Sequence, residues 1–269
     1  MTETDAPKAD RSWRMRTLLD LLSTKGRLSV TDAAAALGVS EATVRRDFTT
    51  LAKQQLATRT HGGLVVASVA YDLPVRYRGG GNDSAKEQIA AAAAALVQRG
   101  QVIGFNGGTT TSATARHVAA RTDLAESGEQ PALTIVTNAL NIATELVLRP
   151  HIRTVSLGGV ARPQSYEVVG PLAHQVLREL WLDHLILGVD GLSSEVGASC
   201  YHEGEASINA LMVERADVVT VVAAAEKLGR RSFARICDLS AIQRIITDSS
   251  ADAGAVAAMR SRGVEVVLV

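Results

Sequence analysis

The segment NGGTTT, from Asn106 to Thr111, has the composition of a loop that binds an anion. It follows the apolar run 102–105 and precedes a stretch that we expect to form a helix. Adjacent glycines let a ligand approach the backbone closely, and a helix N-terminus presents unpaired N–H groups at the positive end of its dipole. The threonine hydroxyls add further donors. The segment therefore predicts a phosphate site; a tight strand-to-helix turn with a threonine cap is the alternative.

Polar residues and glycines also follow several other apolar runs in the second part of the chain. Ligands of open α/β sheets bind at the carboxyl ends of the strands, so these residues are expected to meet in one pocket. The pocket would offer donors for a phosphate, and carboxylates or amides for hydroxyl groups. The predicted effector-binding residues are Asn106, Gly107, Gly108, Thr109, Thr110, Asn138, Gly159, Arg162, Asp190, Glu205 and Lys227.

A second group of chemically suited residues lies near the N-terminus, on a predicted helix from about Glu41 to Lys53. Val44, Phe48 and Leu51 share one face of this helix, whereas small, hydroxylated and basic residues occupy the opposite face and its flanks. Such a face suits the major groove of DNA, where threonine contacts phosphates or thymine methyl groups and arginine binds guanine edges. An amphipathic surface helix with a solvated charged face is the alternative. The residues predicted to bind DNA are Ser40, Thr43, Arg45, Arg46, Thr49, Lys53, Arg59 and His61.

The residues around this helix carry the signals of a winged helix-turn-helix. Ser29, three positions before Asp32, predicts the start of a preceding helix. Gly38 predicts a sharp turn, and Ser40 is a suitable N-cap for the helix that follows. The two glycines at 62–63 predict the turn of a hairpin that would act as a wing. The apolar spacing over 12–24 predicts a further helix at the start of the domain.

From residue 84 onward, β-branched apolar runs alternate with helical stretches. Such alternation is typical of a mostly parallel sheet covered on both faces, so the predicted fold class is α/β. The predicted strands cover 102–106, 133–138, 152–157, 184–189, 218–223, 244–248 and 264–269, and the predicted helices cover 84–99, 111–120, 139–148, 171–180, 204–216 and 252–262.

The predicted organisation is a winged helix-turn-helix domain over 12–66, a linker over 67–83 and an effector-binding α/β domain over 84–269. The linker contains a proline and three consecutive glycines, which favour a hinge. The 269-residue chain has a net charge of zero, but residues 11–63 contain nine Lys or Arg and four Asp or Glu, a net charge of +5 that the remainder must balance. A basic domain joined to an acidic one suits a DNA-binding head on a regulatory domain.

Composition argues against several classes of protein. No run of 18 apolar residues is present, and the polar first ten residues lack a signal core, so we expect a cytoplasmic protein without a membrane span. Cys200 and Cys237 do not form a disulfide framework. Although His202 lies near Cys200 in the sequence, no cysteine pair has the spacing of zinc ligands. No metal or cofactor is therefore predicted.

Two sets of motifs resemble the DeoR family of bacterial sugar-operon repressors. SEATVRRDFTTL (40–51) followed by THGG (60–63) resembles the family's DNA-binding signature, and NGGTTT, TNAL, SLGG, GVDGL, EGEA and EKLG resemble its effector-domain motifs in order. The resemblance implies that the effector domain has the fold of ribose-5-phosphate isomerase and glucosamine-6-phosphate deaminase. It also implies that a phosphorylated sugar releases the repressor from its operator, with Lys227 neutralising the ligand.

Three positions depart from the resemblance, and each loses an ionisable group. Asn106 and Ala224 stand where aspartate is usual, and Asn209 stands where lysine is usual. A phosphorylated ligand is still expected, because the phosphate loop and Lys227 remain. The departures leave open a different sugar part or a less charged ligand.

The predicted function is a transcription repressor of a carbohydrate operon that binds double-stranded operator DNA and a small-molecule effector, with no catalytic residues. Two heads are needed for useful DNA affinity, so a homodimer or homotetramer is expected. One alternative is a phosphosugar isomerase or deaminase with a DNA-binding head, for which Glu203, Glu205 and Asp190 are candidate bases. The uncharged residues at 106, 209 and 224 argue against a working acid–base set. A second alternative is a repressor that has lost its effector and responds to a protein partner.

Overall fold

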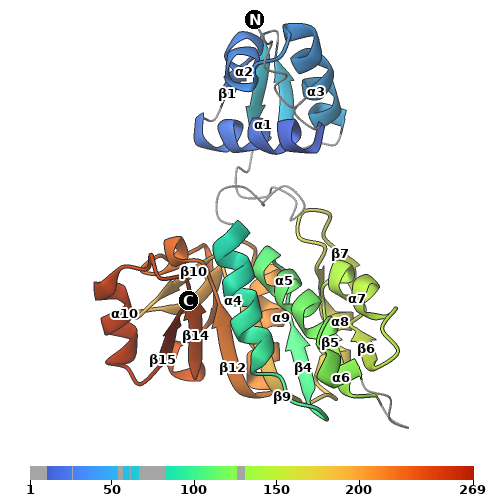
Figure 1. The fold of residues 1–269 in the computed structure, drawn as a ribbon, viewed down its shortest axis with the longest axis vertical. Coiled ribbons are helices and arrows are strands. Elements are labelled where there is room, and N and C mark those ends of the chain that lie inside the picture. The colour runs from blue at the N-terminus through green and yellow to red at the C-terminus, as the bar shows by residue number, and fades with distance from the viewer. Residues whose placement is uncertain (1–10, 26, 54–56, 61, 67–82, 126–130) are drawn as a thin grey trace, which may run out of the picture. The chain divides into compact units, whose positions relative to one another are not determined.

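The computed structural model describes the chain except for residues 1–10, 26, 54–56, 61, 67–82 and 126–130. The chain divides into two compact units, Met1–Gly81 and Asn82–Val269, which are described separately (Figure 1). The first ten residues and nearly all of the predicted linker lie outside the described residues. Within the described ranges, no helix has both the length and the apolar character needed to cross a membrane.

The N-terminal unit is a winged helix-turn-helix, as predicted. Its strands form an antiparallel sheet in the order β1-β3-β2. Its buried core includes Met15, Leu18, Leu19, Leu22, Val44, Phe48 and Leu51, which come from the first and third helices. The elements are α1 (Arg11–Lys25), β1 (Arg27–Ser29), α2 (Val30–Leu37), α3 (Glu41–Lys53), β2 (Ala57–Thr60) and β3 (Gly63–Val66).

The helix boundaries in this unit follow the capping signals of the sequence. Ser29 caps α2: its Oγ accepts a hydrogen bond from the Asp32 N–H at 3.0 Å and donates one to Asp32 Oδ2 at 2.7 Å. Gly38 ends α2 with a φ of 63°, a left-handed conformation that glycine adopts without steric cost. The Thr43 N–H donates to Ser40 Oγ at 3.3 Å, which confirms Ser40 as the cap of α3.

The hairpin of the wing differs from the prediction in one respect. Gly63 does not turn the chain; it lies in β3 and pairs with Thr60 on one side and Ser29 on the other. A Cβ at this position would lie 2.2 Å from the Leu28 carbonyl oxygen, so glycine permits the close approach of β1. The three-residue strand β1 was not predicted because so short a segment shows no periodicity.

The C-terminal unit is built on a seven-stranded sheet in the order β15-β14-β12-β9-β4-β5-β6. Every neighbouring pair of strands is parallel. All seven carboxyl ends therefore lie along one edge, as the predicted site requires. The strands are β4 (Val102–Phe105), β5 (Leu133–Thr137), β6 (Ile152–Ser156), β9 (Leu182–Gly188), β12 (Ala216–Val222), β14 (Arg244–Thr247) and β15 (Glu265–Leu268), which confirms the seven predicted strands.

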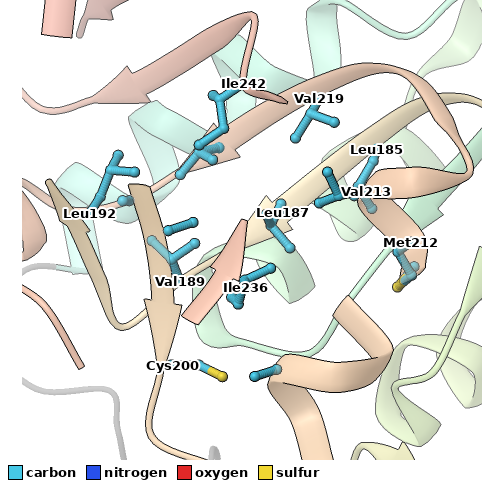
Figure 2. Close-up of a cluster of buried hydrophobic side chains, with 14 of the residues drawn as sticks. Leu185, Leu187, Val189, Leu192, Cys200, Met212, Val213, Val219, Ile236 and Ile242 are labelled. Carbon is cyan, nitrogen blue, oxygen red and sulfur yellow. The ribbon is translucent and has the colours of Figure 1, made fainter. Parts of the chain in front are cut away.

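Helices cover both faces of this sheet. One apolar cluster joins α4 (Asp83–Ala95), α5 (Thr109–Ala119), α6 (Thr122–Ala125) and α7 (Leu140–Leu146) to the face that carries Ile103 and Phe105. The other joins α8 (Pro171–Leu177), α9 (Glu203–Glu214) and α10 (Ala253–Arg260) to the face that carries Leu185 and Leu187. In Figure 1, α4 and α5 lie in front of the sheet, and Figure 2 shows Leu185, Leu187 and Met212 in the second cluster.

The first helix of this unit ends at Ala95 rather than at the predicted Arg99. The Gln98 N–H donates to the side chain of Gln101 at 2.8 Å, so it is not available to an i−4 carbonyl. The Leu96 and Val97 N–H groups already bond to carbonyls three residues back. A local side-chain contact therefore ends the helix one turn before Gly100.

Several short elements near the carboxyl edge of the sheet were not predicted. β10 (Gly191–Ser193), β11 (Gly197–Cys200) and β13 (Ala234–Cys237) form a small antiparallel sheet, and β7 (Val160–Ala161) pairs with β8 (Val168–Val169) in a hairpin. Two 3-10 turns, η2 (Ala225–Lys227) and η3 (Leu239–Ala241), complete the unit. These strands have two to four residues and lack the longer apolar runs that indicate β4, β14 and β15. These elements matter because they carry part of the candidate site.

Candidate functional site

The face of α3 opposite the core is exposed, as the helical wheel predicts. Val44, Phe48 and Leu51 are buried, whereas Arg45 and Arg46 are exposed. Of the other predicted DNA-binding residues, Ser40 and Arg59 are exposed and Thr43 and Thr49 are partly exposed. His61 and the side chain of Lys53 lie outside the described residues. The arrangement presents basic and hydroxyl groups together on one accessible helix face.

Hydrogen bonds link the wing strand to this helix. Thr49 Oγ1 donates to the Arg45 carbonyl oxygen at 2.8 Å and accepts from Arg59 Nη1, also at 2.8 Å. Arg45 Nη2 in turn donates to Glu41 Oε2 at 2.6 Å. The structure therefore brings Arg45, Thr49 and Arg59 together, although Arg59 comes from β2 and the other two from α3.

Asp47 has a structural role that the sequence did not reveal. It is buried, and its Oδ2 accepts a hydrogen bond from Arg14 Nε at 3.0 Å. The side chains of Arg14 and Asp47 are only 17% and 5% exposed. A partly buried, hydrogen-bonded ion pair thus joins α1 to α3. The helical wheel places position 47 beside Leu51, but it does not reveal a partner 33 residues away.

At the carboxyl edge of the sheet, the predicted phosphate loop connects β4 to α5. Gly107, Gly108 and Thr109 are partly exposed, and Thr110 is buried at the first turn of the helix. Gly108 has a φ of 145°, which L-residues rarely adopt. The loop therefore has the accessible glycine pair and the helix N-terminus that anion binding requires.

Asn106 does not face this loop; it joins two strands. Its Nδ2 donates to the Gly188 carbonyl oxygen at 2.9 Å, and its Oδ1 accepts from the Gly188 N–H at 2.7 Å. Both polar atoms of the side chain are thereby engaged between the ends of β4 and β9. An aspartate has no N–H group to donate to the Gly188 carbonyl, so the amide suits both bonds.

The sequence did not reveal Glu167, which reaches the phosphate loop from the segment before β8. The Gly107 N–H donates to Glu167 Oε1 at 2.6 Å, and Asn138 Nδ2 donates to the same oxygen at 3.3 Å. Glu167 is only 3% exposed. Its burial, and next the negative charge of Glu205, raise the pKa of the carboxyl to about 8. No spacing pattern indicates a contact between positions 60 residues apart.

A second carboxylate in this region is paired with a cation. Arg162, in the turn between β7 and β8, donates from Nε to Glu205 Oε1 at 2.9 Å. These side chains are 15% and 11% exposed. The same turn contains Tyr166, which has a φ of 61°. The hairpin thus places Arg162 against Glu205 near the start of α9 and brings Glu167 to the phosphate loop.

Two of the remaining predicted residues, Lys227 and Gly159, lie after β12 and at the start of the β7–β8 hairpin. Lys227 Nζ donates to the Val189 carbonyl oxygen at 2.5 Å and lies 3.9 Å from Asp190 Oδ1. Gly159 is exposed at the start of the β7–β8 hairpin, where a Cβ would be 2.7 Å from the Val169 carbonyl oxygen. Its φ of 150° and the packing of the hairpin therefore both favour glycine at this position.

Further acidic and polar groups adjoin this region. Burial raises the pKa of the Cys200 thiol above its usual range, and the charges of Asp190, Glu205 and Glu167 raise it further. Asn138 and Asn209 are buried, and the Oδ1 atom of each has no hydrogen-bond partner among the described residues. Within those same ranges, no group of three or more His, Cys, Asp or Glu side chains is placed to hold a metal ion.

An exposed recognition helix with a wing, followed by a separate α/β domain with a polar site at its carboxyl edge, defines a DNA-binding regulator with a sensor domain. Two family matches make this assignment specific. Residues 14–69 match the DeoR-like helix-turn-helix domain, and residues 81–249 match the DeoR C terminal sensor domain. The chain belongs to the DeoR family of transcription regulators, which confirms the predicted class of function.

Similar proteins include two that are named as transcription regulators. The HTH-type transcriptional regulator GlpR of Haloferax volcanii is 36% identical over 256 residues, 94% of this chain and 96% of its own. The glycerol-3-phosphate regulon repressor of Escherichia coli K12 is 27% identical over 232 residues, 86% of this chain and 88% of its own. These relatives are regulators rather than enzymes, and the chain spans nearly their whole length.

Partial matches among solved structures include an enzyme and a regulator. Ribose 5-phosphate isomerase A from Methanocaldococcus jannaschii is 18% identical, with a TM-score of 0.41 over 55% of each chain. The sorbitol operon regulator SorC from Klebsiella pneumoniae is 12% identical, with a TM-score of 0.37 over 80% of this chain and 89% of its own.

Proposed function

We propose that this chain represses a carbohydrate operon and leaves its operator when a phosphorylated sugar, or a similar small anionic metabolite, binds at the carboxyl edge of the sensor sheet. The observation that carries the ligand class is the glycine pair at the N-terminus of α5, where Gly107, Gly108 and Thr109 are partly exposed. A relative is named for a regulon of a phosphorylated small molecule, glycerol 3-phosphate. We place this regulator in the cytoplasm, where operator DNA is found.

The DNA-binding part of the proposal rests on α3 and the wing. We assign the contact with double-stranded DNA to the domain over 12–66, with a linker over 67–83. Arginine binds guanine edges, whereas serine, threonine and lysine contact phosphates and fix the position of the helix. The proposed residues are Ser40, Thr43, Arg45, Arg46, Thr49, Lys53, Arg59 and His61, of which Arg45 and Arg46 are exposed.

The ligand-binding part of the proposal assigns the effector to the domain over 84–269. The N–H groups of the phosphate loop and the hydroxyls of Thr109 and Thr110 would hold the anionic group. Lys227 would neutralise it, because its Nζ is held at the carboxyl end of β9 by the Val189 carbonyl oxygen and lies 3.9 Å from Asp190 Oδ1. Asn138, Arg162, Asp190 and Glu205 would contact the rest of the ligand, and Asn106 and Gly159 would support the loops.

We further propose that the protein acts as a homodimer or homotetramer. A single helix-turn-helix reads a short half-site, so two heads on one repeated operator raise the affinity through effective concentration. Light scattering at micromolar protein concentration, with and without DNA, measures the assembly. A monomer under both conditions would contradict this part of the proposal.

Thermal denaturation of the full chain with a panel of sugar phosphates tests the ligand class. A ligand that binds the folded state raises its melting temperature, and the unphosphorylated sugars serve as controls. We expect a phosphorylated compound to give a shift that Thr109→Val and Lys227→Gln each reduce. Thr109→Val is preferable to a change at Gly108, because the φ of 145° there would strain any side chain. Shifts that are equal in wild type and both variants would refute the assignment of this pocket.

A further inference from the structure

The phosphate loop already holds an acidic group of the chain itself. Glu167 Oε1 lies 2.6 Å from the N atom of Gly107, which places an oxygen where an anionic ligand would accept the same N–H. The contact is close: a Cβ added to Gly107 would lie 2.4 Å from Glu167 Cγ and 2.9 Å from Glu167 Oε1. The carboxyl therefore occupies one donor of the proposed anion site.

A carboxylate and a ligand anion at one donor exclude each other. A single N–H directed at one oxygen does not serve a second acceptor equally well, and two negative charges in a poorly hydrated region repel strongly. Ligand binding through the Gly107 N–H thus requires Glu167 to leave that N–H, and binding of any anion beside Glu167 is weakened while its carboxyl is charged.

We propose that Glu167 is a built-in competitor of the ligand's anionic group, and that it determines how strongly the sensor domain binds anions. The inference rests on the proposed function, because it concerns the same loop. It differs from that function in assigning to the chain a residue that opposes the ligand rather than one that binds it.

The surroundings of Glu167 support the competition. Asn138 Nδ2 donates to the same carboxyl oxygen, whereas Asn138 Oδ1 is fully buried and has no partner among the described residues. A ligand hydroxyl or a protonated carboxyl near this atom would supply the missing donor. The side chain of Asn138, which contacts Glu167, therefore has a buried acceptor whose donor a ligand could supply.

Charged and titratable groups act on Glu167 from several elements. Burial raises the pKa of Glu167 most, and the like charges of Glu205 in α9 and Asp190 after β9 raise it further. Arg162 of the hairpin is engaged with Glu205, and Lys227 of η2 lies beside Asp190. The thiol of Cys200 in β11 also adjoins these acids. Among the contacts given above, Glu205 is paired with Arg162 and Asp190 lies near Lys227, whereas Glu167 accepts hydrogen bonds from amide groups alone.

Two substitutions separate charge from bulk. Glu167→Gln removes the charge but keeps the size and an acceptor for the Gly107 N–H. Glu167→Ala also frees that N–H. Glu214→Gln is a matched control, since it removes the same charge from the exposed end of α9.

The experiment measures the binding of inorganic sulfate to the full chain by thermal denaturation, with sodium chloride at matched ionic strength. Sulfate keeps its charge between pH 6 and pH 9, so its own titration does not contribute. We expect Glu167→Gln to lower the dissociation constant about tenfold at pH 9, where a carboxyl with a pKa of about 8 is roughly nine-tenths ionised in the wild type, and Glu167→Ala to lower it at least as far. The control should match the wild type.

The pH dependence gives a readout that a purely structural role would not produce. The ratio of the wild-type to the Glu167→Gln dissociation constant should rise between pH 6 and pH 9, as Glu167 ionises in the wild type. Glu205, Asp190, Cys200, Arg162 and Lys227 are present in both proteins, so their titration largely cancels in the ratio. A constant ratio, or equal dissociation constants at every pH, would overturn the inference.

The outcomes also separate this inference from the proposed function. Tighter sulfate binding by Glu167→Gln with no response of any variant to sugar phosphates would support the competitor and refute the proposed ligand class. A sugar phosphate that binds wild type and Glu167→Gln equally would support the ligand class and refute the competitor. Failure of all variants to bind sulfate or any sugar phosphate would refute both.

Discussion

The two functional regions of this regulator differ in whether their charged side chains are exposed or buried. On α3, Arg45 and Arg46 are exposed, and the buried face is apolar apart from the Asp47 carboxylate, which is paired with Arg14. In the sensor domain, Glu167 and Glu205 are themselves buried and interact with a backbone N–H and with Arg162. The first arrangement leaves charges available to a large, highly charged partner. In the second arrangement, the buried carboxyl groups are already engaged with other groups of the same domain.

The contrast predicts how each region responds to substitution. Exposed pairs such as Arg45–Glu41, with side chains 55% and 44% exposed, contribute little to stability because water and salt screen them. Removal of one partner from a buried pair leaves an uncompensated charge and costs far more. Changes on α3 should therefore act on DNA binding, whereas changes in the pocket should act on stability as well as on ligand binding.

The largest effect is expected at the buried pair of the sensor domain. Arg162→Met should destabilise the protein by about 3 kcal/mol, because Glu205 would remain buried without its partner. The double variant Arg162→Met/Glu205→Met should recover most of this loss, since apolar side chains of similar size replace the pair. Urea denaturation monitored by circular dichroism measures both. A single variant as stable as the wild type would contradict the contrast between the two regions.

The second effect concerns DNA recognition. Arg46→Ala should weaken specific binding by about 1–3 kcal/mol, the usual contribution of an arginine–base contact, without a comparable loss of stability. Fluorescence anisotropy with a fragment selected from random DNA sequences measures the affinity. Arg153→Ala is the control, because Arg153 is also an exposed arginine but lies in the other domain. Unchanged affinity and sequence preference in Arg46→Ala would refute the assignment of α3.

A third effect follows from the raised pKa of Glu167, about 8 in the folded protein against an ordinary value of 4.5. Between these values the folded state holds a proton that the unfolded state has released. The contribution of this group is therefore most favourable below about pH 4.5, declines as pH rises and is fully lost above about pH 8. Glu167→Gln should gain stability relative to the wild type between pH 6 and pH 9. Urea denaturation at both values tests this, and an unchanged difference would show that Glu167 is already ionised at pH 6.

The smallest effect is expected for Arg45→Ala. This residue is exposed and already engaged with Glu41, so we expect a loss of less than about 1 kcal/mol in DNA affinity and little change in stability. If Arg45 contacts a phosphate, its replacement would also reduce the slope of log affinity against log salt concentration by about one unit. Titrations at several salt concentrations measure both quantities. A loss larger than that of Arg46→Ala would reverse the proposed roles of the two arginines.

The sequence predicted regular structure where hydrophobic residues repeat over a long enough segment. The wheel placed Val44, Phe48 and Leu51 in the core, and β-branched runs located the seven strands of the main sheet. Residues at the strand ends were predicted to converge because parallel strands end at one edge. Contacts made by short segments could not be predicted. Glu167 reaches Gly107 because it lies in the hairpin formed by the two-residue strands β7 and β8. Asp47 of α3 contacts Arg14 of α1, which is 33 residues away in the sequence.

We propose that a ligand at the carboxyl edge of the sensor sheet controls the affinity of the other domain for DNA. Allostery of this kind requires tighter ligand binding to the DNA-free protein. The direct test titrates full-length protein on a labelled operator fragment with the sugar phosphate that gives the largest thermal shift. We predict that Lys227→Gln and Thr109→Val bind DNA as the wild type does but need at least about tenfold more ligand for release, since each loses a ligand contact. Release of both variants at the wild-type ligand concentration would contradict the claim and place the effector elsewhere.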